Sequence, residues 1–134
     1  MTRHRKTVAD LLHNRSKTQR AEKGADAEQV AELWLQQRGL SVIARNYRCK
    51  SGEIDRVMLE QQTLVFVEVR LRTRGDFGGA AASITPAKQQ RLIKTAQLFL
   101  MQYPQFSRHA CRFDVMLATD IETWQWLRDA FAGN

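Results

Sequence analysis

The chain has 134 residues, of which 43% are hydrophobic and 26% are charged, and its formal net charge at pH 7 is +7. This length suffices for one domain with its own core and excludes two. The composition is that of an ordinary soluble protein, and no apolar run approaches the roughly 20 residues of a membrane span. We therefore expect a cytoplasmic protein with no membrane partner. Two cysteines, Cys49 and Cys111, exclude a disulfide framework.

Basic residues are concentrated at the N-terminus of the chain. Residues 1–23 contain seven Arg or Lys residues against two acidic ones, a net +5 of the total +7. This polar stretch predicts a mobile basic arm over residues 1–23, followed by a single α/β domain over residues 24–134. The arm could hold phosphate by counterion release or could act only as a solubilising tail.

The first predicted helix begins after Gly24 and ends at Gly39, a residue typical of helix C-termini. Its apolar residues recur at helical spacing and form one buried stripe, made of Ala27, Val30, Ala31, Trp34 and Leu35. Glu28 lies at the border of this stripe, whereas Glu32 is expected further toward solvent. Glu28 can be a site residue or an ordinary first-turn acid favoured by the helix dipole.

Three strands are predicted next, over residues 40–49, 53–59 and 64–69. If Gln61 and Gln62 form a two-residue loop, Asp55 faces Glu68 across an antiparallel pair, where like charges are destabilising. A bound cation would relieve this repulsion, and carboxylate oxygens suit magnesium. A three-residue loop would instead set Asp55 against Val67. Glu68 could alternatively form a structural pair with an arginine, the candidates being Arg56, Arg70 and Arg72.

A glycine-bearing loop over residues 75–83 follows a run of three arginines, Arg70, Arg72 and Arg74, and could approach a phosphate. Thr85 and Pro86 then predict a helix start, as N-cap and first residue. Lys88 would point inward from the first turn, against the helix dipole. It either extends its amine to solvent or is held there by an anion or an acidic site.

Two strands complete the predicted fold, over residues 111–117 and 122–127. Arg112 and Asp114 are expected on one face of the first of them. Trp124 and Trp126 share one side of the second, where they cover the core edge or a dimer contact in preference to stacking bases. The element order is αβββαββ, which predicts an α/β sandwich with a mixed five-stranded sheet flanked by helices.

Four sequence blocks, GEIDRVM, TLVFVEVRLR, GGAAASITPAKQQRL and CRFDV, occur in order along the chain. Together they resemble the uncharacterised YraN-like family of bacteria over nearly all of residues 24–131. That family is similar in predicted fold to the PD-(D/E)-x-K nucleases, in particular archaeal Holliday-junction resolvases and restriction-endonuclease-like domains. The resemblance implies a restriction-endonuclease-like sandwich and, since junction resolvases work as dimers, a homodimer.

The resemblance also implies a site for Mg²⁺ or Mn²⁺. Its ligands would be Asp55, Glu68, the Val69 carbonyl and, directly or through water, Glu28. Arg70 occupies the position where the nucleases carry lysine. Arginine can stabilise a phosphorane-like transition state but stays protonated and cannot act as general base.

Two functions follow from this resemblance. The first is a magnesium-dependent nuclease acting on DNA, including branched or structured DNA, with Lys88 replacing the missing amine. The second is a noncatalytic nucleic-acid or protein-binding module that keeps the nuclease fold, which Arg70 favours. A purely structural role in a complex would instead use Trp124 and Trp126 as an interface.

Overall fold

A computed structural model describes residues 20–71, 84–118 and 123–133, with the side chains of residues 20–25 excepted. Its elements are α2 (Arg20–Gln36), β1 (Leu40–Cys49), β2 (Gly52–Glu60), β3 (Thr63–Leu71), α3 (Pro86–Gln102), the short 3₁₀ helix η2 (Pro104–Phe106), β4 (Ala110–Ala118) and β5 (Trp124–Phe131). The predicted order αβββαββ is confirmed. Helix α2 begins at residue 20, so residues 20–23 of the predicted arm belong to it. The rest of the arm, and the loop over residues 75–83, lie outside the described residues.

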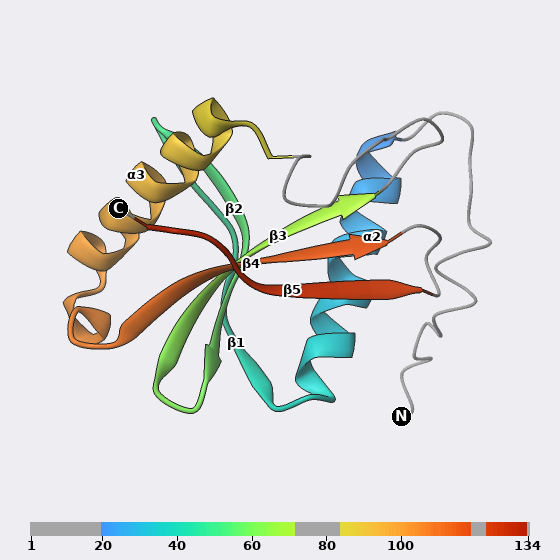
Figure 1. Cartoon of the computed structure of the whole chain (residues 1–134), viewed down its shortest axis with the longest axis horizontal. Helices are drawn as coiled ribbons and strands as arrows, with labels where there is room; N and C mark the ends of the chain where they lie inside the picture. Colours follow the sequence, from blue (N-terminus) through green and yellow to red (C-terminus); the bar gives the residue numbers. More distant parts are fainter. Residues whose placement is uncertain (1–19, 72–83, 119–122, 134) are drawn as a thin grey trace, which may run out of the picture.

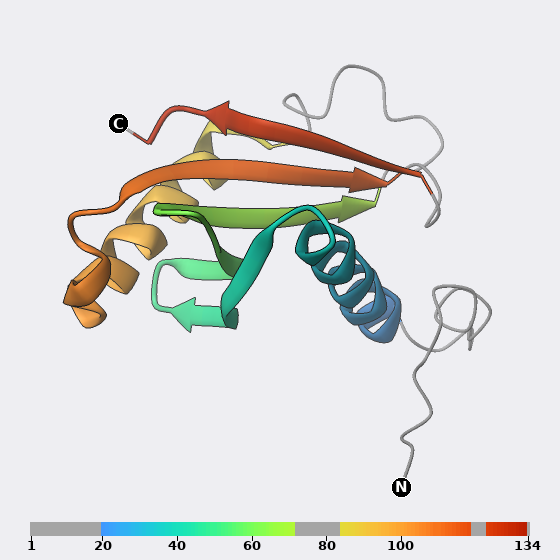
Figure 2. The ribbon, with the colours of Figure 1, turned by 90° about the horizontal axis from the view of Figure 1, so that it is seen from below.

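The five strands form one mixed sheet in the order β1-β2-β3-β4-β5. Strands β3 and β4 are parallel, and the other neighbouring pairs are antiparallel. Parallel neighbours require a crossover connection, which here contains α3. Figure 2 shows β3, β4 and β5 lying side by side.

The two helices cover opposite faces of the sheet (Figure 1). Successive strand side chains alternate between two hydrophobic clusters, one on each face. On β3, Leu64 and Phe66 pack with α3, whereas Val65 and Val67 pack with α2. Trp124 and Trp126 pack against the α2 cluster, as the core-edge interpretation predicted. The fold is therefore a three-layer arrangement with the sheet in the middle.

The hairpin between β2 and β3 has the predicted two-residue loop. Gln61 adopts a left-handed conformation, with φ of 54°, as such tight hairpins require. Glu60 pairs with Thr63, and Val57 pairs with Phe66. Neither α2 nor α3, the helices of the described part of the chain, is long and apolar enough to cross a bilayer.

Candidate active site

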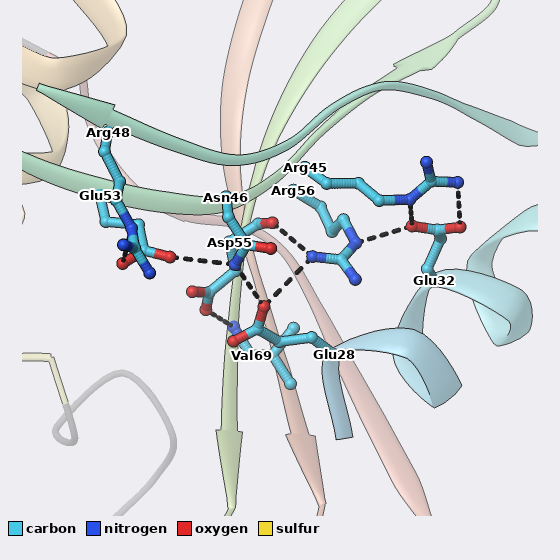
Figure 3. A network of polar contacts seen from close by, with 9 residues as sticks. All are labelled: Glu28, Glu32, Arg45, Asn46, Arg48, Glu53, Asp55, Arg56 and Val69. Carbon is cyan, nitrogen blue, oxygen red and sulfur yellow. Dashed lines mark hydrogen bonds and ion pairs between the residues drawn. The ribbon is translucent and has the colours of Figure 1, made fainter. Parts of the chain in front are cut away.

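The candidate site lies where β2 and β3 stop pairing. Their ladder ends at Arg56 and Val67, and Asp55 and Glu68 would be the next pair in the same register. There the Val69 N–H donates a hydrogen bond of 2.8 Å to Oδ2 of Asp55 (Figure 3). The Glu68 side chain lies close enough to Asp55 to raise the pKa of the Asp55 carboxyl group. The two acids predicted to meet on facing strands thus do meet.

The electrostatics of Asp55 reflect this crowding of acids. Burial, the hydrogen bond to Glu68 and the negative charges of Glu68 and Glu28 raise the pKa of Asp55 to about 9, although the Val69 N–H opposes the shift. The metal-free pair therefore favours holding one proton, which the two acids share. The site holds either a proton or another cation between the two acids.

Lys88 reaches Glu68 from the first turn of α3. Thr85 caps this helix, and its hydroxyl accepts a hydrogen bond of 3.2 Å from the Lys88 N–H. The Lys88 Nζ lies 2.7 Å from Oε2 of Glu68, in a charge pair whose angles are not those of a directed hydrogen bond. The Glu68 side chain is 7% exposed and that of Lys88 is 32% exposed. Lys88 thus points inward toward an acidic site, the second of the two predicted alternatives.

Glu28 stands beside the pair but is held by other residues. Arg56 Nη1 lies 3.1 Å from Oε1 of Glu28, and Nδ2 of Asn46 lies 2.7 Å from the same oxygen (Figure 3). Its charge nevertheless reaches Asp55, since it contributes to the raised pKa of Asp55. Glu28 therefore acts on the site through its field and is anchored by Arg56 and Asn46.

Glu32 corrects one sequence expectation, because it is buried and does not lie toward solvent. Arg56 Nε lies 2.7 Å from its Oε1, and Arg45 binds both carboxylate oxygens at 2.8 and 2.9 Å. Although burial opposes it, the hydrogen bonds and charges of Arg45 and Arg56 hold the pKa of Glu32 below its ordinary value. Two arginines thus supply the charge that lets this carboxylate be buried.

Asn46 is the site neighbour that sequence reasoning missed. The pairs on either side of it place Asn46 opposite Asp55. Its φ of 50° is left-handed, a conformation in which Asn is enriched. Its Nδ2 also lies 3.0 Å from Oε1 of Glu53, so one amide joins α2 to β2. The sequence signal was a polar Asn, between Arg45 and Tyr47, inside the strand predicted over residues 40–49.

Comparison with known proteins shows the family of this chain. Residues 27–118 match the family described as Uncharacterised protein family UPF0102. The chain belongs to this family. The resemblance to the YraN-like family is thereby confirmed, and the matched residues of this UPF0102 chain include Glu28, Asp55, Glu68, Arg70 and Lys88.

Three UPF0102 proteins illustrate the similarity. One from Ralstonia nicotianae is 59% identical over 112 residues, covering 81% of this chain and 85% of its own length. One from Methylobacillus flagellatus is 52% identical over 111 residues, covering 81% and 96% respectively. One from Nitrosomonas europaea is 51% identical over 114 residues, covering 81% and 92%.

The donor set of this UPF0102 chain fits a magnesium site with two carboxylates. Within the described ranges, no group of three or more His, Cys, Asp or Glu residues is arranged to hold a metal ion. Asp55 and Glu68 are in contact, however, and magnesium often takes only one or two carboxylates while keeping several waters. Glu28 is anchored by Arg56 and would contact the ion through a water molecule. Arg70 follows Glu68 by two residues on β3 and is half-buried.

Proposed function

We propose that the chain is a magnesium-dependent, nuclease-like protein that hydrolyses phosphodiester bonds in DNA, including branched or structured DNA. The proximity of Asp55 and Glu68, which follow the last pair of the β2–β3 ladder, carries this proposal. Two acids held together need a proton or a metal ion between them, and a proton makes the pair costly to ionise. The Lys88 amine beside them supplies the cation that phosphoryl chemistry requires.

Asp55 and Glu68 would hold Mg²⁺, or Mn²⁺, together with the Val69 carbonyl. When bound, the ion would polarise a phosphoryl oxygen and lower the pKa of a water molecule. The Val69 N–H fixes one oxygen of Asp55 and leaves the other for this role. Glu28, held by Arg56 and Asn46, would orient a water on the same side.

The two cations near the acids have different roles in this scheme. Arg70 stays protonated at any physiological pH, so it would stabilise charge on the phosphate and would not move a proton. The Lys88 amine can exchange its contact with Glu68 for one with the scissile phosphate. Lys88 would thereby replace the lysine that nucleases of this fold carry at the position of Arg70.

A noncatalytic binding module is the second candidate, and a specific observation favours it. Glu28 and Glu32 are already paired with Arg56, and Glu32 is paired with Arg45 as well. Carboxylates neutralised in this way need no metal ion to balance their charge. Such a module would keep the nuclease architecture and bind nucleic acid or protein.

A cleavage assay tests the nuclease proposal. Junction, flap and single-stranded DNA substrates are incubated with the full chain and magnesium or manganese. We expect cutting by the natural chain and a loss of about 100-fold or more in Asp55→Ala and Glu68→Ala, since each removes a metal ligand. Glu60→Gln is the matched control, because Glu60 pairs with Arg112 and Arg128 at the hairpin end of β2. Equal cutting by both alanine variants would identify a contaminant and refute the proposal.

Calorimetry separates the two candidates. A nuclease of the proposed kind binds magnesium, and Asp55→Asn abolishes the heat of that binding. A noncatalytic module gives no magnesium heat and keeps the same nucleic-acid affinity in Asp55→Asn without any divalent ion.

A further inference from the structure

Most described basic side chains have partners, and the exceptions are few. Four side chains form no ion pair or side-chain hydrogen bond with other described residues, namely Lys50, Arg91, Lys94 and Arg108. All four residues are exposed. The first three lie close together, and Arg108 lies elsewhere.

The end of β1 and the start of β2 lie against α3, and Lys50 is in the turn between them, two residues before Gly52. A Cβ at Gly52 would lie 3.4 Å from Oγ1 of Thr95 and 3.8 Å from Cβ of Arg91. Lys94 lies three residues beyond Arg91 on the same helix, and residues at that spacing are neighbours on a helix surface. We call Lys50, Arg91 and Lys94 the basic ridge.

The basic ridge continues into the acid site. Lys88, which contacts Glu68, lies one helical turn before Arg91. With a rise of about 1.5 Å per residue, Lys88 and Lys94 are about 9 Å apart along the axis of α3. A row of cations therefore leads from Asp55 and Glu68 along the outer side of α3.

We propose that the basic ridge binds the phosphate backbone of duplex DNA and holds the duplex beside the acid site. The choice of ligand rests on the proposed function. Cations without protein partners are suited to phosphate, and spaced cations follow a backbone without reading its sequence.

The positions of the aromatic rings near the basic ridge favour duplex DNA over unstacked single strands as the ligand. Tyr47 of β1 and Phe99 of α3 pack against each other, with centroids 5.1 Å apart. Phe99 is buried in the α3 cluster and Tyr47 is half-buried against it. This part of the described fold therefore presents cations and not a stacking platform, which single-strand binders use.

The test is a salt series of duplex-DNA binding by the full chain in EDTA, read by fluorescence anisotropy. The variant Lys50→Gln/Arg91→Gln/Lys94→Gln removes the basic ridge. We expect the slope of log K against log salt to become shallower by about 2 to 3, and the affinity near 0.1 M salt to fall about tenfold or more. The basic arm over residues 1–23 is common to all variants, so it cancels in the difference.

Arg108→Gln is the matched control, because it removes an equally unpaired charge from a cleft beside η2 and the start of β4. Its slope and affinity should equal those of the natural chain. Thermal melting of the triple variant should also be unchanged, since none of its three side chains has a partner to lose among the described residues. A triple variant that binds duplex DNA like Arg108→Gln would overturn the inference.

Two further results would separate DNA binding by the basic ridge from the nuclease proposal. If the triple variant loses duplex binding while no form of the chain cuts DNA, the basic ridge stands and the nuclease proposal falls. If Asp55→Ala abolishes cutting while the triple variant keeps its salt slope, the reverse holds. Loss of binding to anionic phospholipid vesicles, with duplex binding retained, would also overturn the assignment to DNA.

Discussion

Asp55 carries a free-energy cost that its surroundings impose. Burial and the neighbouring carboxylates of Glu68 and Glu28 raise its pKa from 3.8 to about 9. The folded chain therefore holds this proton more tightly than the unfolded chain does. Between about pH 4 and pH 9 the unfolded state binds fewer protons at this group, so its contribution to stability falls as the pH rises. Residues that await a ligand often have such a cost.

We expect Asp55→Asn to stabilise the metal-free protein, because asparagine keeps the neutral state at every pH. The gain in free energy of unfolding should grow with pH up to about pH 9, by at most about 1.4 kcal/mol per pH unit. Urea denaturation in EDTA at several pH values measures it. Glu60→Gln, which alters a different acid, should show no such growth toward pH 9. A gain for Asp55→Asn that stayed constant with pH would contradict the assignment of the proton to Asp55.

At the scale of elements, the N-terminus of α3 decides where Lys88 goes. Pro86 fixes the first helical residue, and the Thr85 hydroxyl accepts from the Lys88 N–H at 3.2 Å. This cap orders the turn whose lysine then meets Glu68. A local signal that is legible in the sequence thus positions a side chain in the site.

Thr85→Ala should lower the free energy of unfolding by about 1 kcal/mol, because the cap bond is lost. It should also weaken the contact between Lys88 and Glu68, since the first turn frays. Guanidinium denaturation measures the first effect, and the nuclease assay measures the second. Thr85→Ser keeps the hydroxyl and should retain most of the stability. If Thr85→Ser lost as much as Thr85→Ala, the methyl group and not the cap would be responsible.

The whole molecule should respond to magnesium if Asp55 and Glu68 hold it. A ligand that binds only the folded state adds about 2.7 kcal/mol when its free concentration is about 100 times its Kd. We expect the melting temperature of the natural chain to rise with added MgCl₂ and to fall back on addition of EDTA. Differential scanning calorimetry measures this shift.

Asp55→Asn should have the higher melting temperature without magnesium and should gain nothing from adding it. Glu60→Gln should respond to the ion as the natural chain does, because Glu60 lies at the other end of β2. An equal magnesium shift in Asp55→Asn would place the bound ion away from this site.

The pairing of charged side chains was the part of the site that the sequence predicted least accurately. Arg56 was weighed as a partner of Glu68, but it points to the opposite face and binds Glu28 and Glu32 of α2. Helical spacing predicted Glu32 on the solvent side, yet Arg45 and Arg56 come to it from β1 and β2. Which cation meets which acid depends on how a helix lies across a sheet, and no local spacing contains that information.

Local chemistry by itself predicted the element order, and it offered the two-residue loop at Gln61 and Gln62, and hence the approach of Asp55 to Glu68, as one of two registers. These follow from period-2 alternation, turn length and capping, all of which act within a few residues of the chain. Only the tertiary structure decided that Asn46 and Arg56 anchor Glu28, and that Gly52 lies against Arg91 of α3. Those contacts join residues separated by 18 to 39 positions, and they form only when both helices are packed on their faces of the sheet.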